Sequence, residues 1–290
     1  MDAQHAGKYA RALDAYHALG YFAQEVAEHL TGAGLRGSRM CYFASRSAPM
    51  GQVGPEVVAA TFYNFNPELV AKSIPDAWGF ATPEAVTQAR LAGIDAALRR
   101  ILGDDLIGSP DLAQAADIAA IAAGAARPDG RPLFAAHTTI ERPAEPHLAL
   151  WHSLTLLREY RGDGHIAALQ VVGLSGLEAL IAHSATGAGF TEQTAKMLRG
   201  WSDEQWNDAV AQLRDRDILD GSGALTELGV EVRQAAEDLT DDLAVAPWAE
   251  LGDDGLARLV ELTTPVREAI AASGVFPREA FGPKWGKGSR

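Results

Sequence analysis

Cysteine is almost absent from this sequence of 290 residues, because Cys41 is the single example. One cysteine can form neither an intrachain disulfide nor a cysteine-based zinc site. The histidines form no HExxH or His-x-His pair, so we expect no metal site. Walker, GxGxxG, GxSxG and HRD motifs are also missing, and we therefore expect no cofactor.

Long apolar runs are missing as well. No run of about 18 apolar residues occurs, so no membrane-spanning helix is expected. The amino-terminal residues are charged and amphipathic, unlike a signal peptide, and we expect a cytoplasmic protein.

Lysine is scarce, and the net charge is −13 with a pI of about 5.0. Duplex DNA binding needs a local excess of Lys and Arg, so this balance argues against a DNA partner. What the sequence has in abundance is alanine, together with other good helix formers. We expect a mainly α protein.

The most informative stretch lies near residue 200. It predicts a short helix from Thr191 to Gly200, a turn at Trp201 and Ser202, and a second helix from Asp203 to Leu219. A Gly-rich turn at 220–223 follows. Two helices joined by a tight turn and followed by a hairpin tip are typical of a winged helix-turn-helix.

Periodicity and capping residues predict the remaining helices. Arg161 to Gly164 is expected to be a turn between two helices, and Pro247 is expected to break the chain before the last helix. The other helices are expected at about residues 3–30, 55–63, 67–74, 83–103, 111–126, 145–160, 165–172, 175–186, 226–244 and 253–273.

The two halves of the chain resemble each other in layout. Segments 42–78 and 170–206 align without a gap and place Trp78 on Trp206. A duplication would give two winged-helix-like halves arranged as an intrachain pseudo-dimer, the first lacking its wing. Because identity between the segments is near chance level, an unrelated origin of the halves stays open.

On this interpretation the chain has three parts. Residues 1–130 form an amino-terminal helical domain, residues 131–280 form a winged helix-turn-helix domain, and residues 281–290 form a flexible tail.

The order of helices resembles the MarR-type winged-helix regulators, which are two-fold dimers, and a homodimer therefore stays open. More closely, the phrases ATFYNFNPELV, IPDAW, LREYRGDGHIAAL, GLSGLEAL and LRGWSDEQW resemble an actinobacterial family with a helix-turn-helix-like label. The resemblance covers about Tyr9 to Ala272. It implies the fold and no particular activity.

The densest polar stretch is 158–165. His165, oriented by Asp163, is a candidate general acid or base, and Arg158 or Arg161 could bind an anionic group. The alternative is a helix end whose carbonyls are satisfied by Arg and His, with Gly162 as the C-cap.

Five further residues are candidate ligand contacts. His17 and His152 occupy equivalent places in the two halves, and Arg46 lies beside an apolar stretch. Tyr63 and Asn64 lie at a helix junction, where pockets form. The alternative for each is ordinary core packing.

The second helix of the helix-turn-helix begins with Asp203 and Glu204, although base-reading residues usually lie in that part of the helix. We therefore expect a winged-helix protein that binds a small molecule in a pocket between its halves. A cofactor-free acid–base enzyme of secondary metabolism is one form of this hypothesis. The alternatives are a MarR-like ligand-responsive transcriptional regulator and a protein-interaction module.

Overall fold

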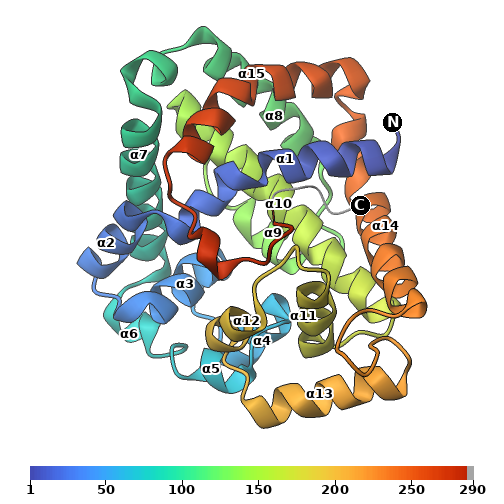
Figure 1. The fold of residues 1–290 in the computed structure, drawn as a ribbon. Coiled ribbons are helices and arrows are strands. Elements are labelled where there is room, and N and C mark those ends of the chain that lie inside the picture. Colours follow the sequence, from blue (N-terminus) through green and yellow to red (C-terminus); the bar gives the residue numbers. More distant parts are fainter. Residues whose placement is uncertain (286–290) are drawn as a thin grey trace. The chain divides into compact units, whose positions relative to one another are not determined.

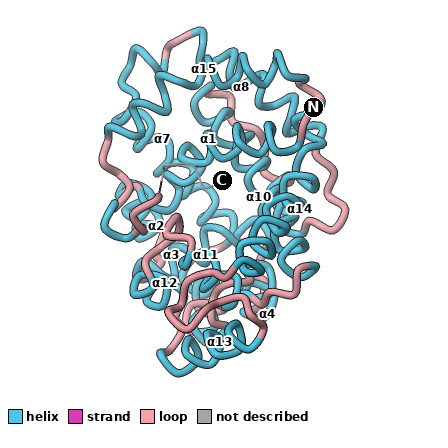
Figure 2. Tube along the Cα trace, turned by 45° about the vertical axis from the view of Figure 1, so that its right-hand side comes forward, coloured by secondary structure: helices cyan, strands magenta, loops and turns pink. Residues whose placement is uncertain are grey.

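The computed structural model describes residues 1–285, and helices form nearly all of their regular structure (Figures 1 and 2). No strand forms within those residues, which contain two isolated antiparallel bridges, Phe190 with Phe281 and Leu219 with Leu225. The prediction of a mainly α protein is confirmed. The helices are α1 (Ala3–Phe22), α2 (Gln24–Gly32), α3 (Gly37–Ser47), η1 (Ala48–Met50), α4 (Pro55–Phe62), α5 (Pro67–Ala71), α6 (Ala77–Phe80), α7 (Pro83–Ile107), α8 (Pro110–Ala125), α9 (Pro132–His137), α10 (Pro146–Val171), α11 (Gly176–Ala185), α12 (Glu192–Arg199), α13 (Asp203–Asp215), α14 (Glu227–Ala249), α15 (Gly252–Ala272) and η2 (Arg278–Ala280).

The chain divides into two compact units. Unit 1 contains Met1–Gly54, Ser73–Gly164 and Asp241–Phe276, and unit 2 contains Pro55–Lys72, His165–Thr240 and the segment from Pro277. The chain passes between the units within α10 and within α14. The predicted boundary at residue 130 divides the sequence into halves, and it stays a prediction.

Close packing of α2 on α7 organises part of unit 1. Thr82 caps α7 by accepting a hydrogen bond from the backbone N–H of Ala85. A Cβ atom at Gly93 would lie 2.5 Å from the Cα of Val26, so glycine is needed for this approach of two helix backbones. Ile94 and Leu98 follow on the buried face of α7.

The first predicted helix, 3–30, is wrong as a single element. Ala23 has an extended backbone (ψ 131°) and separates α1 from α2. Alanine favours helices and the apolar spacing continues through this point, so neither signal marks the break. At the predicted end of α7, Gly103 (φ 68°) bends the chain, and helical structure resumes to Ile107.

The predicted turn at Arg161 to Gly164 is also wrong, because α10 runs through it without a break. Gly162 and Gly164, the two glycines of this segment, allow arginine side chains to pack closely against α10. A Cβ at Gly164 would lie 2.7 Å from Nη1 of Arg131, and one at Gly162 would lie 2.8 Å from Nη1 of Arg158. Gly162 therefore does not cap a helix.

Pro247 does not break the chain, and α14 continues to Ala249. It lies within the last turn, so the missing N–H removes one hydrogen bond close to the helix end. Helix α13 ends at Asp215, earlier than predicted, because Asp217 adopts a left-handed conformation (φ 54°).

Unit 2 contains the predicted pair of helices and the turn between them. Thr191 caps α12, and Gly200 ends it in the left-handed conformation. Ser202 and Gln205 form a capping box at the start of α13. The chain then turns through 220–223, between the bridged residues Leu219 and Leu225. Trp206 and Leu213 of α13 lie in the buried apolar core of the unit.

The predicted tail begins inside the described residues. Phe281 stacks on Phe190, with ring centroids 4.8 Å apart, and Trp285 stacks on Phe281. Residues 286–290, the rest of the predicted tail, lie outside the described residues.

No single helix in residues 1–285 is both long and apolar enough to cross a membrane. Helices α10 and α11 meet that test only when counted together across a sharp bend.

Candidate functional site

Glu159 of α10 is completely buried in unit 1, with 0 % of its surface exposed. Arg46 of α3 binds it with two parallel hydrogen bonds, Nε to Oε1 at 3.0 Å and Nη2 to Oε2 at 2.7 Å. Burial alone would raise the pKa of Glu159, but the charge and the hydrogen bonds of Arg46 lower it well below its usual value. Glu159 is therefore an ionised carboxylate inside the protein.

His17 and Tyr21 of α1 extend this arrangement. His17 Nδ1 lies 3.0 Å from Thr155 Oγ1, and His17 Nε2 lies 2.7 Å from the Tyr21 hydroxyl. That hydroxyl donates to Glu159 Oε1 at 3.4 Å. Burial lowers the pKa of His17 well below its usual value, so the ring is neutral near neutral pH and links two hydroxyl groups.

Arg90 of α7 is 3 % exposed. Its Nη1 donates to the carbonyl of Ser45 at 3.2 Å, and its guanidinium lies 5.0 Å from the Trp151 ring and 5.8 Å from the Tyr21 ring. Its Nε and Nη2 have no hydrogen-bond partner within the described part of the chain. Buried arginines are normally paired, so Arg90 is exceptional.

His137 of α9 is the second buried group with an unused polar atom. Its Nδ1 lies 2.9 Å from the carbonyl of Leu133, and since a carbonyl only accepts, Nδ1 carries the proton. Its Nε2 has no partner among residues 1–285. Burial lowers the pKa of His137 to about 4, with Glu159 opposing and Arg90 reinforcing the shift. Neutral His137 therefore presents a bare acceptor.

We call the set formed by His17, Tyr21, Arg46, Arg90, His137 and Glu159 the Glu159 cluster. Arg158 lies beside it and binds Asp14, Nε to Oδ1, at 2.9 Å. Arg161 is paired elsewhere, because its Nη1 lies 2.5 Å from Asp241 Oδ1, which also binds Arg11. Three of the predicted residues, His17, Arg46 and Arg158, are thus brought together, and Arg161 is not.

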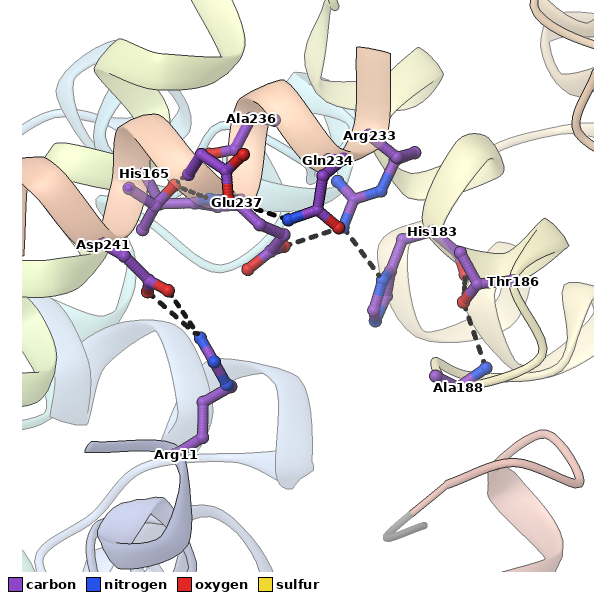
Figure 3. Close-up of polar contacts among 12 residues, drawn as sticks. Arg11, His165, His183, Thr186, Ala188, Arg233, Gln234, Ala236, Glu237 and Asp241 are labelled. Atoms are coloured by element: carbon purple, nitrogen blue, oxygen red, sulfur yellow. Dashed lines mark hydrogen bonds and ion pairs between the residues drawn. The ribbon is translucent and has the colours of Figure 1, made fainter. Parts of the chain in front are cut away.

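The two predicted catalytic residues have separate partners. Asp163 Oδ2 accepts from the backbone N–H of Phe134 at 2.9 Å, and burial raises the pKa of Asp163 to about 6. His165 Nδ1 lies 2.8 Å from Thr240 Oγ1 on α14 (Figure 3). Residues two apart on one helix do not face each other, so α10 directs these side chains to different sides.

The remaining predicted ligand residues are His152, Tyr63 and Asn64. His152 is buried on α10, and burial together with Arg142 lowers its pKa to about 4. In unit 2, the Tyr63 hydroxyl donates to the carbonyl of Leu174 at 2.8 Å, and the carbonyl of Asn64 accepts from Trp201 Nε1 at 3.0 Å. The contacts of Tyr63 and Asn64 hold the segment 55–72 in its unit.

The surface of α13 is acidic at its start. Asp203 and Glu204 are exposed in the first turn, and Asp203 binds Lys196 at 2.6 Å. Arg214 donates to the carbonyls of the turn at 220–221, and Arg216 binds Glu178 at 2.8 Å. Both arginines at the end of α13 therefore have partners inside unit 2.

A family comparison decides what kind of chain this is. The sequence matches a helix-turn-helix family over residues 6–277, nearly its full length. The chain belongs to this helix-turn-helix family. No curated protein and no solved structure matches it.

Sequence reasoning missed four residues of this helix-turn-helix protein's buried cluster: Tyr21, Arg90, His137 and Glu159. A signal for Arg90 exists in the sequence. It lies four residues after Val86 and four before Ile94, so it falls on the apolar stripe of α7, where a charge is out of place. No group of three or more His, Cys, Asp or Glu side chains arranged to hold a metal occurs in residues 1–285.

Proposed function

We propose that this helix-turn-helix protein binds a small molecule at the Glu159 cluster. The observation that carries the proposal is the contact of Arg46 with a completely buried Glu159, next to buried groups with unused polar atoms. His17, Arg46 and Arg90 come from the first half of the sequence, and Glu159 comes from the second. The proposal thus keeps the predicted binding of a ligand where the sequence halves meet.

The free-energy cost of burying charged groups supports this proposal. Burying charged groups is costly even when they are paired, and replacing them with apolar residues often leaves a fold as stable or more stable. Perturbed titratable groups therefore gather where they serve binding or catalysis. The Glu159 cluster combines buried Arg90, a buried carboxylate and two buried, neutral histidines with Arg46, whose side chain is 13 % exposed.

The finer features of the fold are part of the same proposal. We propose two winged-helix-like halves, 1–130 and 131–280, related as a pseudo-dimer, with the first half lacking a wing. The likeness to MarR-type regulators supports this arrangement and a ligand between the halves. A cytoplasmic location, a homodimer, an actinobacterial origin and a role in secondary metabolism are further proposals that rest on the resemblance and the composition.

Catalysis would be an extension of binding. The proposed acid–base residues are His165 and Asp163, each acting from its own side of α10, and an enzyme that uses His165 would lose turnover in His165→Ala. Unchanged turnover in that variant would remove His165 from the mechanism.

The test of binding is mass spectrometry of small molecules released when protein purified from its own host is denatured. We expect a specific molecule from the wild type and at least tenfold less from Tyr21→Phe, which removes only the hydroxyl that contacts His17 and Glu159. Thr264→Val, which removes an exposed hydroxyl of α15 bonded to its own helix, is the matched control. An empty wild-type protein, or equal amounts from both variants, would contradict the proposal.

The second candidate is a ligand-responsive transcriptional regulator, favoured by membership of a helix-turn-helix family. A gel shift whose affinity falls steeply with salt would support it, because phosphate contacts release counterions. The acidic start of α13 and the internal contacts of Arg214 and Arg216 argue against duplex binding through that helix.

A further inference from the structure

Residues 277–285, which we call the strap, pair with residues 187–191, the segment that leads into α12. Three backbone hydrogen bonds join the two segments, N–H to carbonyl: Gly282 to Gly189 at 2.8 Å, Lys284 to Gly187 at 2.9 Å, and Thr191 to Ala280 at 3.1 Å. Both segments belong to unit 2. The strap thus runs antiparallel beside the chain that enters the helix-turn-helix.

Aromatic stacking and close backbone contact fix the position of the strap. The Phe281 ring stacks on Phe190, whose ring centroid also lies 5.4 Å from the guanidinium of Arg199 at the end of α12. A Cβ atom at Gly282 would lie 2.4 Å from the carbonyl oxygen of Gly187, so glycine is needed where the two backbones approach each other. Side chains and backbone of both segments therefore specify this pairing.

Thr191 connects the strap to α12. Its N–H donates to the strap, and its side-chain oxygen accepts from the N–H of Thr194 at 3.3 Å as the N-cap of α12. An N-cap side chain binds one of the backbone N–H groups that the first turn of a helix leaves unpaired. Opening of the strap removes the backbone bond that holds Thr191 in this capping position.

Packing holds the start of α12 only weakly. Of its eight described residues, Ala195 is the one that is buried. Helices of this length are marginal in water on their own. The carbonyl of Arg199 at the other end accepts from the N–H of Asn66 at 2.9 Å, so that end is fixed independently of the strap. The strap therefore acts on the first turn of α12.

The contacts of the strap are those of a segment that opens locally. Each of its residues is at least partly exposed, and its pairing with 187–191 is an isolated bridge. Segments with few buried contacts and exposed hydrogen bonds open at a much lower free energy than the core of the same protein. Trp206 and Leu213 of α13, in contrast, lie in the buried core of unit 2.

We infer that the strap is a conformational switch of the helix-turn-helix. Paired with 187–191, it fixes Thr191 and orders the first turn of α12. When it opens, that turn loses its cap while α13 stays packed in the core. A partner that recognises α12 and α13 together therefore requires the paired strap. The strap belongs to unit 2 and acts whether or not unit 1 binds a molecule.

Amide hydrogen exchange of the full chain, followed by NMR, tests the switch. In the wild type we expect the amides of Gly282 and Lys284 to exchange about a hundredfold faster than that of Leu213, because the strap opens while the core stays folded. Equal rates for the three amides would mean that the strap opens only when unit 2 unfolds, and would overturn the switch.

Gly282→Ala is the deciding variant, because its methyl group would meet the carbonyl oxygen of Gly187 and force the two backbones apart. We expect the amide of Lys284 to lose its protection. The amides of Thr194 and Ala195, which are bonded to Thr191, should then exchange about fivefold to tenfold faster, as for the loss of one helix cap. Unchanged exchange at the start of α12, with the strap open, would overturn the coupling.

Two further variants complete the test. Gly221→Ala, in the same unit and at a position where a Cβ would have no neighbour within 4 Å, is the control and should exchange like the wild type. Phe281→Ala removes the ring that stacks on Phe190 without hindering the backbone, and should speed exchange at Thr194 by a smaller factor. Faster exchange of Leu213 in Gly282→Ala or Phe281→Ala would show that the whole unit unfolds, and would overturn a switch confined to α12.

Discussion

Two buried glutamates, one in each unit, have different kinds of partner. In unit 2, Glu178 completes a capping box with Ser175 and binds the partly exposed Arg216, so its carboxylate serves the end of a helix. In unit 1, Glu159 lies in the middle of α10, caps nothing and binds the part-buried Arg46. Helix capping explains the position of Glu178 but not that of Glu159, and the complete burial of Glu159 is why we assign ligand binding to unit 1.

The largest expected difference between the units is in the free energy of unfolding that is lost when each of these two carboxylates is removed. Glu159→Gln leaves the largely buried Arg46, with 13 % of its side chain exposed, without a counter-charge and should lower the free energy of unfolding by about 3–5 kcal/mol. Glu178→Gln keeps a residue that completes a capping box and should cost about 1 kcal/mol or less. Urea denaturation measures both values, and equal costs would remove the contrast between the units.

Glycine substitutions should sharpen the comparison. A Cβ at Gly176 would lie 1.9 Å from the carbonyl oxygen of Tyr63, so Gly176→Ala must displace the backbone and should cost about 1–3 kcal/mol or more. Gly20→Ala in unit 1 should cost nothing or stabilise the protein by about 0.5–1 kcal/mol. In thermal denaturation the Tm of Gly176→Ala should fall, and the Tm of Gly20→Ala should stay unchanged or rise. A neutral Gly176→Ala would contradict the tight packing of segment 55–72 on α11.

Asp163 gives unit 1 an expected pH dependence. Its pKa is raised to about 6 by burial, so the folded state prefers the protonated acid. Its contribution to stability is therefore present at low pH and is lost as the pH rises from the unfolded value through about 6. Asp163→Asn should stabilise the protein at neutral pH, by about 1.4 kcal/mol for each unit of the shift, and have little effect in acid.

Denaturant titrations of wild type and Asp163→Asn at two pH values measure this effect. Asparagine keeps an oxygen that can accept from the Phe134 N–H. The substitution therefore retains this hydrogen bond and removes only the ionisable group. A stabilisation of the same size at both pH values would show that ionisation of Asp163 is not its cause.

The smallest effect is expected at the turn after α13. Arg214 donates to the carbonyls of Asp220 and Gly221, and Arg214→Ala should cost roughly 0.5–1.5 kcal/mol because these bonds are exposed. Faster amide exchange confined to 219–225 would confirm that Arg214 fixes the turn. If the variant instead weakens a salt-dependent DNA complex, Arg214 contacts phosphate and the regulator hypothesis gains support.

Local signals in the sequence predicted much of the fold. Caps and glycines placed α11, α12 and α13, because Ser175, Thr191 and Ser202 act on their own helices. The errors occurred where distant contacts outweigh local preference. Gly164 avoids a clash with Arg131, 33 positions earlier in the chain, and no local pattern distinguishes such a glycine from one in a turn.

The candidate site was predicted in part. His17, Arg46 and Arg158 were named, and the structure gathers them near Glu159. His137 was missed because its importance comes from burial and an unused atom, which depend on tertiary structure, whereas the place of Arg90 on the apolar stripe of α7 was a local signal that was overlooked. Tyr63 and Asn64 were chosen for their place in a loop, and their contacts in unit 2 are those of packing residues.

Hydrogen exchange with and without the molecule released from the wild-type protein tests the central claim most directly. The account predicts slower exchange in peptides of unit 1 that contain Tyr21, Arg46, Arg90 and Glu159, and no change in 192–215. Protection confined to 192–215, with the peptides around Glu159 unchanged, would place the ligand in the helix-turn-helix and contradict the account.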